Sequence, residues 1–436
     1  MLYGWLSCVG LAPFLFRSLL PTVPTSLQRL QKRAPIESTR YRTPAAESAR
    51  GGIRFDRNEL AGAFGDIGTD LPLLVGMVLA AQLDSTSILV MFGVMQLFTA
   101  LRYRIPMPVQ PLKAMAALVI AQHLHGTVLY GAGLAIGVTM LVLSVTGLID
   151  WLARVIPKSV IRGIQFGLGL QLASLALKDY VRAEGVVGYW LAAVAFVLTI
   201  FLIRNRRYPA ALFVILLGLV YAFALKLTLA TVTQSVGFHV PHVHVPQWSD
   251  IATGFLILAL PQIPLSLGNS VLATRQIAED LFPHKQLTVR QISLTYALMN
   301  LVTPFFSGIP VCHGSGGMAG HYAFGGRTGG SVIIYGLFYI TLGLFFGEGF
   351  DTLVGVFPLP ILGVLLLFEG LTLMLLVRDT AHAKTDFPIV LLVGLAASAL
   401  PYGYVIGLVG GTGLAYITRK YLLELADDTT GALRAR

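Results

Sequence analysis

Two short stretches of the sequence have the residue types of an anion site. One reads Pro108-Val109-Gln110-Pro111 and the other Pro310-Val311-Cys312-His313, and an apolar segment follows each. We expect a helix to begin after each stretch, near Leu112 and at Ser315. The first N–H groups of a helix have no partner within it, and together with the helix dipole they attract negative charge. Two helix starts that face each other would therefore bind an anion.

The second stretch continues as Gly314-Ser315-Gly316-Gly317-Met318-Ala319-Gly320. Because this run has few side chains, its N–H groups can approach an oxyanion closely, and the Ser315 hydroxyl adds a donor. Glycines in membrane helices also serve close packing, but the preceding Pro-Val break favours the anion site. No Gly-Lys-Ser/Thr follows the glycines, so a phosphate loop for ATP is excluded and transport would be secondary or passive.

Lys113 is the one Lys or Arg that falls inside a predicted membrane span away from the ends of that span. A lone cation inside a membrane is costly and marks a functional site. It would partly neutralise a dianion bound at the helix start. The alternative is that its side chain extends to the inner surface near Arg102 and Arg104.

Three acidic residues, Asp66, Asp70 and Glu369, fall inside predicted spans, and we expect them to act in coupling or gating. Asp70 corresponds to Gln262 in an internal repeat, so both are expected to line one central space. An acid beside an anion repels it unless the acid is protonated, which offers a route to proton-coupled uptake. Asp66 could instead bond backbone at a helix irregularity, and Glu369 could pair within the scaffold.

The remaining candidates are neutral donors. Gln262 and Asn269 are seven residues apart and share a helix face, and His313 precedes the second half-helix, where a structural role is an open alternative. His239, His242 and His244 form either a metal-binding group or an ordinary polar loop. We expect ten residues to bind substrate: Thr69, Gln110, Lys113, Ala114, Gln262, Asn269, His313, Ser315, Gly316 and Gly317.

Composition supplies the setting for these residues. Of the 436 residues, 55% are hydrophobic and 12% charged, whereas soluble proteins carry about 25% charged residues. Apolar runs near the length that crosses a bilayer, about 20 residues, recur along most of the chain. The sequence therefore predicts an all-α polytopic membrane protein and excludes an ordinary soluble enzyme.

Hydropathy predicts fourteen spans, near residues 60–82, 86–101, 108–125, 129–149, 160–178, 187–203, 209–226, 254–274, 291–308, 314–324, 330–347, 356–377, 387–400 and 402–418. If the first span runs from inside to outside, the inner connections carry eighteen Lys and Arg and the outer ones three. Short cytoplasmic loops are enriched in Lys and Arg. Both termini are therefore predicted to be cytoplasmic, with an external loop at 227–253.

An internal repeat organises these spans. Asp70-Leu71-Pro72 matches Gln262-Ile263-Pro264, and the two Pro-Val stretches match at nearly the same spacing. The matches are seven spans apart, an odd number, so the second copy is inverted. We expect two inverted seven-span repeats, at 55–226 and 254–420, with half-helices in spans 3 and 10 and a cytoplasmic tail at 421–436.

The first 50 residues differ from the rest, with seven basic residues against two acidic ones. They form a targeting peptide, a weak anchor, a disordered tail or a product of the assigned start. The two cysteines, Cys8 and Cys312, provide neither a disulfide framework nor a metal cluster, and we expect no cofactor and no metal.

Four motifs together resemble the molybdate transporter family, which is related to the sulfate permeases and has the uracil-permease-like fold. They are Gly65-Asp66-Ile67-Gly68-Thr69, residues 108–114, residues 312–320, and Phe324-Gly325-Gly326-Arg327-Thr328-Gly329. The resemblance covers residues 55–420 and implies a core domain that moves against a gate domain. It also implies a tetrahedral oxyanion substrate, molybdate or sulfate.

The sequence departs from that family at two positions and from the related sulfate permeases in one respect. Family members usually carry Met where Leu112 stands and Ala where Ser315 stands, and the second change falls at the predicted site. No STAS-like domain follows residue 420, which differs from typical sulfate permeases and suits the molybdate branch.

We therefore predict a secondary transporter that imports molybdate across the cell membrane, inner or plasma, with no nucleic-acid partner and a homodimer left open. The alternatives are a sulfate transporter or a nucleobase permease of the same fold. A nucleobase permease would carry a carboxylate in the eighth span, where this sequence has Gln262 and Asn269. A membrane enzyme using Cys312 and His313 is the alternative from another class.

Overall fold

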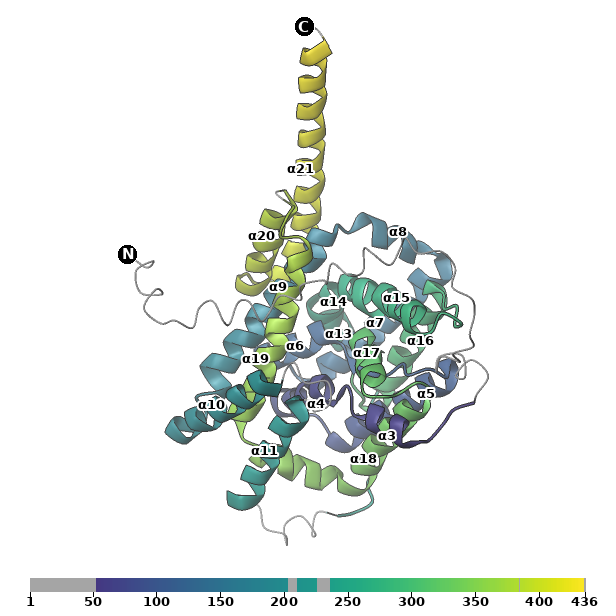
Figure 1. Cartoon of the computed structure of the whole chain (residues 1–436), viewed down its shortest axis with the longest axis vertical. Coiled ribbons are helices and arrows are strands. Elements are labelled where there is room, and N and C mark those ends of the chain that lie inside the picture. Colours follow the sequence, from purple (N-terminus) through teal and green to yellow (C-terminus); the bar gives the residue numbers. More distant parts are fainter. Residues whose placement is uncertain (1–51, 203–209, 226–235, 384, 435–436) are drawn as a thin grey trace, which may run out of the picture. The chain divides into compact units, whose positions relative to one another are not determined.

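The computed structural model describes residues 52–202, 210–225, 236–383 and 385–434. These residues are predominantly helical, with two short strands (Figure 1). The helical class predicted from composition is confirmed. The basic segment 1–50 and residues 227–235 of the predicted external loop lie outside the described residues.

The N-terminal half contains α3 (Arg57–Ala63), α4 (Ile67–Ala81), α5 (Ser85–Tyr103), β1 (Val109–Pro111), α6 (Lys113–Gln122), α7 (Gly126–Thr146), α8 (Leu148–Val155), α9 (Lys158–Leu175), the π-helical segment η2 (Ala176–Tyr180), α10 (Gly185–Leu202) and α11 (Ala210–Leu225). Short helix α8 was not predicted. The two half-helices, α6 here and α17 below, begin within one residue of their predicted starts.

The C-terminal half contains α13 (Trp248–Gly254), the π-helical η3 (Phe255–Ala259), α14 (Leu260–Leu265), the π-helical η4 (Ser266–Leu272), α15 (Ala273–Leu281), α16 (Val289–Val302), the 3-10 turn η5 (Thr303–Phe306), β2 (Val311–His313), α17 (Ser315–Ala323), α18 (Gly330–Val356), α19 (Leu359–Leu375), the 3-10 turn η6 (Leu376–Asp379), α20 (Asp386–Ala399) and α21 (Gly403–Arg434). Each predicted span overlaps at least one helix of the structure.

Eight stretches of the described residues are long and apolar enough to cross a membrane: Arg57–Ala81, Ser85–Tyr103, Gly126–Thr146, Lys158–Tyr180, Gly185–Leu202, Trp248–Leu281, Gly330–Gly347 and Leu359–Asp379. Of α10 only 22% is buried, and Trp190 and Phe201 are among its exposed side chains. An apolar surface of this extent is stable against lipid rather than water.

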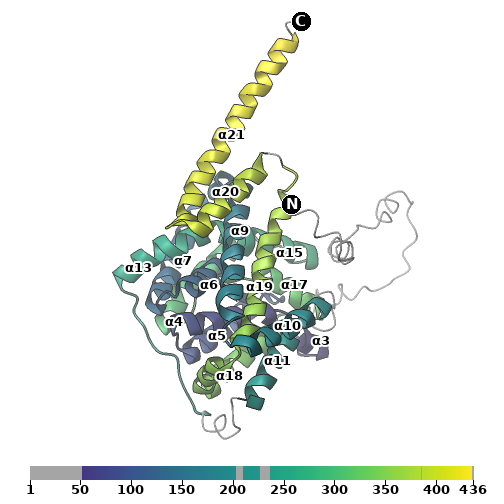
Figure 2. The ribbon, with the colours of Figure 1, turned by 90° about the vertical axis from the view of Figure 1, so that its left-hand side faces the viewer.

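The helices pack as two groups. In the central group, α5 packs on α18, and α7 packs on α16 and α13. In the flanking group, α9 packs on α19 and α20, while α10 lies beside α11 and α19 (Figure 2). Helix α4 also contacts α19, and α6 contacts α9. The boundary between the groups therefore runs along α4 and α6.

The two strands pair with each other inside the central group, which the all-helical prediction did not include. Val109 lies opposite His313. The Gln96 side chain donates to Val109 O and accepts from Val109 N, both at 2.9 Å. The Asn300 side chain bonds Val311 O and N in the same way, at 2.7 and 2.9 Å. Extended backbone in a membrane interior needs protein partners for its polar groups, and these two amides supply them.

A buried carboxylate fixes the N-terminal end of the first long span. Glu59 of α3 is fully buried, and it accepts from the backbone N–H groups of Arg327, Thr328 and Ser331 at 2.8 to 3.0 Å. These bonds hold α3 on the start of α18, where a negative charge is favourable. In the same turn Gly325 has a φ of +116°, which explains a glycine there.

We predict that Gln96→Leu and Asn300→Leu destabilise the protein by similar amounts. Each change orphans one buried backbone N–H and one C=O, at about 1–3 kcal/mol per group. Thermal unfolding in detergent measures the loss, with the exposed Gln276→Leu as the matched control. Melting temperatures for both variants equal to that of the control would contradict the proposed role of these amides.

Candidate functional site

The strand pairing brings the starts of α6 and α17 to one pocket of about 180 Å³, well above the roughly 10–15 Å³ that one water needs. Its lining comes from the two strands, the starts of α6 and α17, α9, α14, the π-helical η4, and the C-terminal part of α19 with the following η6. The lining residues are Gln110, Lys113, Leu168, Gln262, Leu265, Asn269, Ser270, Cys312, His313, Ser315, Gly316, Thr372, Leu373 and Leu376.

The two helix starts differ in how open they are. At α6, Gln262 Oε1 accepts from the N–H groups of Ala114 and Met115, at 2.9 and 3.3 Å. A neutral amide thus already occupies N–H groups that we expected to be free, and Ala114 contributes its N–H to Gln262 rather than to the pocket. Gln262 Nε2 in turn donates to the Ser266 hydroxyl at 3.1 Å.

The start of α17 is open. Its N-cap residue Gly314 makes no side-chain cap, Ser315 is half-buried, and Gly316 is exposed with no atom near the position of a Cβ. The first turn of α17 therefore presents backbone N–H groups to the pocket, as the glycine run predicted.

Asp66 packs behind this open turn. Its two carboxylate oxygens accept from Gln110 Nε2 at 2.7 and 2.8 Å, and a Cβ on Gly317 would collide with Asp66 Oδ2. Asp66 is buried and lies against the first turn of α17, while Gln262 lies against the first turn of α6. Gly317 is thus required by the Asp66 contact and does not line the pocket.

Asp70 does not line the pocket, in contrast to the expectation from its match with Gln262. It is fully buried, and Asp70 Oδ2 accepts from the Tyr335 hydroxyl at 3.0 Å. The π-helical segments η3 and η4 flank Gln262, and each widens a turn. Helix α4 is a regular α-helix around Asp70, so Asp70 and Gln262 lie in segments of different helical geometry and only Gln262 lines the pocket. Thr69 also lies outside the lining.

Lys113 pairs with Glu369. Its Nζ lies 2.6 Å from Glu369 Oε1, and the side chains are 28% and 12% exposed. The lysine therefore lies at the pocket rather than reaching the inner surface. Because Lys113 starts α6 and Glu369 belongs to α19, the ion pair joins the central and flanking groups.

His313 lines the pocket while its ring is held from behind. Its Nε2 lies 2.7 Å from Thr295 Oγ1, and the Tyr103 ring meets it edge-on at 5.5 Å. Its Nδ1 has no partner among the described residues. Sequence reasoning missed Ser270 and Thr372, although each lies close to a predicted residue on its helix.

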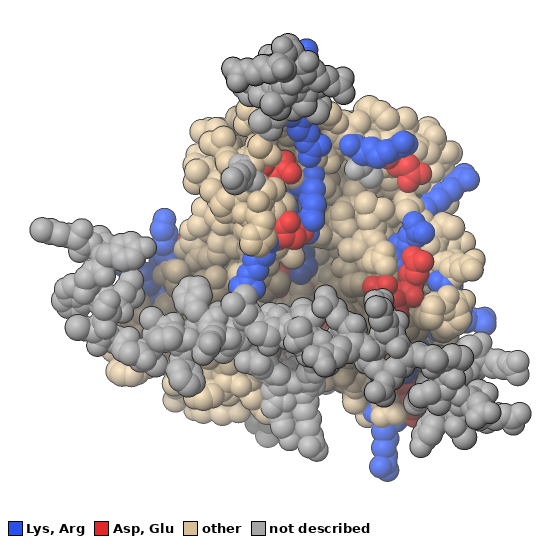
Figure 3. Space-filling model, turned by 45° about the horizontal axis from the view of Figure 1, so that its top comes forward, with Lys and Arg blue, Asp and Glu red and all other residues tan. Residues whose placement is uncertain are grey.

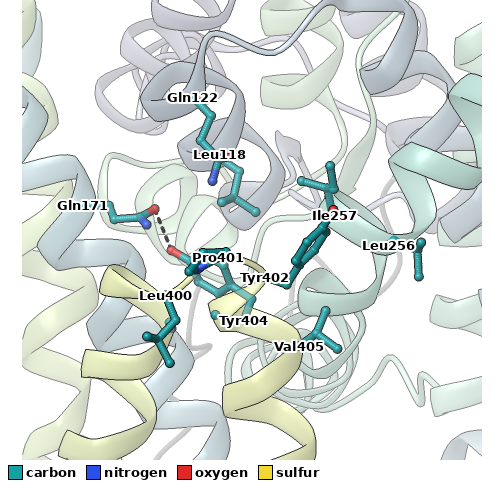
Figure 4. Close-up of a pocket in the computed structure, with 12 residues that line it drawn as sticks. Leu118, Gln122, Gln171, Leu256, Ile257, Leu400, Pro401, Tyr402, Tyr404 and Val405 are labelled. Carbon is teal, nitrogen blue, oxygen red and sulfur yellow. Dashed lines mark hydrogen bonds between the residues drawn. The ribbon is translucent and has the colours of Figure 1, made fainter.

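A second hollow, of about 240 Å³, lies at the other end of α6 (Figure 4). Leu118 and Gln122 of α6 line it together with Gln171 of α9 and residues 400–405, and the Tyr404 hydroxyl donates to Gln171 Oε1 at 2.8 Å. No charged side chain lines this hollow.

The predicted external loop follows an extended path over residues 236–247. His242 Nδ1 lies 3.2 Å from Asp84 Oδ2, and its backbone N–H donates to Ser87 Oγ at 2.8 Å. No group of three His, Cys, Asp or Glu that would hold a metal occurs in the part of the chain that the structure describes.

The solved structures that resemble the chain are transporters. It matches the transmembrane domain of the cyanobacterial bicarbonate transporter BicA with a TM-score of 0.61, at 16% identity, over 84% of this chain and 98% of that one. For the murine anion transporter Solute Carrier 26 family member A9 in the inward-facing state, the TM-score is 0.62 at 14% identity, over 91% and 75%. The fold, the apolar exterior and the interrupted helices define an integral multi-pass membrane protein with the fold of these two transporters.

The family follows from the sequence. The profile described as "Molybdate transporter of MFS superfamily" matches residues 58–172 and 254–373. "Molybdate transporter 2" of Arabidopsis thaliana is 35% identical over 85% of this chain and 89% of its own length. "Molybdate transporter 1" of Chlamydomonas reinhardtii is 28% identical over 82% and 91%. The chain belongs to the molybdate transporter family and is not an enzyme.

We predict that Gly317→Ala lowers thermal stability in detergent, whereas Gly316→Ala does not. The added methyl group collides with Asp66 at residue 317 and meets open space at residue 316, where it also favours the helix. The adjacent position is thus the matched control. Equal melting temperatures for the two variants would show that Asp66 does not pack on this turn.

Proposed function

We propose that the chain is a secondary transporter that carries molybdate into the cell and binds it between the starts of α6 and α17. The observation that carries this is the open first turn of α17 facing the ammonium of Lys113 across one pocket. The names of the relatives that cover most of the chain support molybdate as the anion.

In this site the pocket supplies donors and one cation. The N–H groups of Ser315 and Gly316, the Ser315 hydroxyl and the Asn269 amide would each bond one oxygen of a tetrahedral anion. Lys113 would offset part of its double charge, and His313 could add a ring donor. Gln110 and Gln262 act mainly by holding Asp66 and the α6 start in place. Sulfate has the same shape and charge and is the second candidate substrate.

We propose that the fold consists of two inverted seven-span repeats, 55–226 and 254–420, with residues 421–436 as a tail. If spans correspond seven apart, α5 corresponds to α16 and α7 to α18. Under this correspondence, the contact between α5 and α18 is equivalent to the contact between α16 and α7, and both are present. The clamps made by Gln96 on β1 and Asn300 on β2 correspond in the same way, and antiparallel strands suit inverted copies.

We propose that the central and flanking groups are the core and gate domains, which move against each other. The two hollows support this, since they lie toward opposite ends of the ten-residue helix α6, which is about 15 Å long at 1.5 Å per residue. The pocket at Lys113 would open to the cytoplasm and the one at Tyr404 to the outside.

The proposed orientation places both termini in the cytoplasm, in the cell membrane, with 227–253 outside. Lys and Arg side chains gather in the upper part of the face in Figure 3. Among the described basic residues, Lys158 and Arg162 pair with Asp379 at 2.7 and 2.5 Å. Basic residues at helix ends suit a cytoplasmic surface.

We propose that uptake is coupled to protons. Asp66 and Asp70 are buried, and both interact electrostatically with the partly buried Lys113, which pairs with Glu369, so three ionised acids would face one cation and make this region negative before an anion enters. A dianion in this field is strongly repelled. Protons bound to these acids remove the repulsion, and anion and proton then enter together.

We predict that purified protein in vesicles accumulates labelled molybdate and that Lys113→Gln and Ser315→Leu each reduce uptake at least tenfold. The first variant removes the cation and the second fills the open turn. Tungstate and sulfate as competitors rank the substrates. Lys158→Gln, an exposed lysine in an ion pair, is the matched control. Uptake equal to the wild type in both site variants would contradict the proposed site.

We also predict that an inward proton gradient raises molybdate accumulation. The sign follows because protons that enter with the anion make external acid a driving force. Uptake at external pH 6 and internal pH 7.5 should exceed uptake at equal pH, with the membrane potential clamped by valinomycin and potassium. An uncoupler should abolish the difference, and equal accumulation with and without the gradient would contradict proton coupling.

A further inference from the structure

The cation of the proposed site is already occupied by a carboxylate of the protein. Lys113 Nζ and Glu369 Oε1 are 2.6 Å apart, and both side chains retain some exposure. A carboxylate is itself an oxyanion, and it bonds the ammonium on which a substrate oxyanion would depend. An anion that enters the pocket therefore meets a cation that is already neutralised.

Glu369 lies on the side of its helix that faces the pocket. Thr372, Leu373 and Leu376 line the pocket, and they follow Glu369 by three, four and seven residues, which places all four on one helix face. The carboxylate thus reaches Lys113 from the flanking group at the edge of the binding space.

The other charged groups on the elements around Glu369 either have partners of their own or are exposed. Of the acids that interact with Lys113, Asp66 is bonded to Gln110 and Asp70 to Tyr335. On α9, which packs against α19, Lys158 and Arg162 bind Asp379. On η2, which also contacts α19, Lys178 and Asp179 are exposed. Glu369 is therefore the acid that pairs directly with Lys113 and neutralises its ammonium group.

We propose that Glu369 is a tethered competitor of the substrate anion and that a proton on Glu369 releases Lys113 to bind it. This inference rests on the proposed anion site. A neutral carboxylic acid no longer holds the ammonium, so proton binding and anion binding favour each other, and the linkage is reciprocal. Binding of the proton and of the anion would thus be coupled, because the Glu369 carboxylate and the substrate anion compete for one lysine at the boundary between the two helix groups.

The test is equilibrium binding of labelled molybdate to purified protein from pH 6 to pH 8. We expect the affinity of the wild type to fall as pH rises. Glu369→Gln mimics the released state, so it should bind about tenfold more tightly at pH 8, within the usual range for linked sites, with an affinity independent of pH. In vesicles this variant should exchange molybdate but lose accumulation driven by a proton gradient.

Asp379→Asn is the matched control, because it removes an acid near the end of the same segment and outside the pocket; it should keep the pH dependence of the wild type. If Glu369→Gln does not fold, Glu369→Asp tests the same point. It withdraws the carboxylate by one methylene and should raise affinity several-fold at pH 8. An unchanged affinity in Glu369→Asp, or a wild-type pH dependence in Glu369→Gln, would overturn the inference. Failure of the wild type to bind molybdate at all would instead reject the proposed function.

Discussion

The need to bond extended backbone inside a membrane constrains the whole site. Two membrane segments are interrupted by extended backbone, and the interruptions lie side by side and bond each other through β1 and β2. Gln96 and Asn300 complete the bonding of the strands from neighbouring helices. Because the strands are antiparallel, the helices that follow them begin near one pocket. The position of the anion site is thus a consequence of how the broken backbone is satisfied.

Most of the charged and polar groups around the pocket are likewise bonded to other groups of the protein. One end of the pair of half-helices is closed by the amide of Gln262, and the other is left open at Ser315 and Gly316. Lys113, the one Lys or Arg among the described residues that line the pocket, is held by Glu369, and Asp66 is held by Gln110 against Gly317. In the proposed transport cycle, an anion binds at the open first turn of α17 only after Glu369 has released Lys113.

The sequence predicted the parts of the site that local patterns encode. The Pro-Val breaks and the glycine run located the starts of α6 and α17, and the scarcity of intramembrane charge singled out Lys113. Contacts between distant segments were beyond such patterns: Glu369 is 256 residues from Lys113, and the Glu59 bonds to α18 carry no local signal. The match of Asp70 with Gln262 did not locate Asp70 at the pocket, and the π-helical segments on both sides of the Gln262 helix have no signal in the motif.

The most direct test of the central claim is an experimental structure with molybdate bound, with the metal located by anomalous scattering at the molybdenum edge. Binding between the two half-helix starts predicts a single strong peak within contact of Ser315 and Gly316 of α17, and a Lys113–Glu369 separation longer than 2.6 Å. A peak in the hollow beside Gln171 and Tyr404 instead, with the ion pair intact, would contradict it.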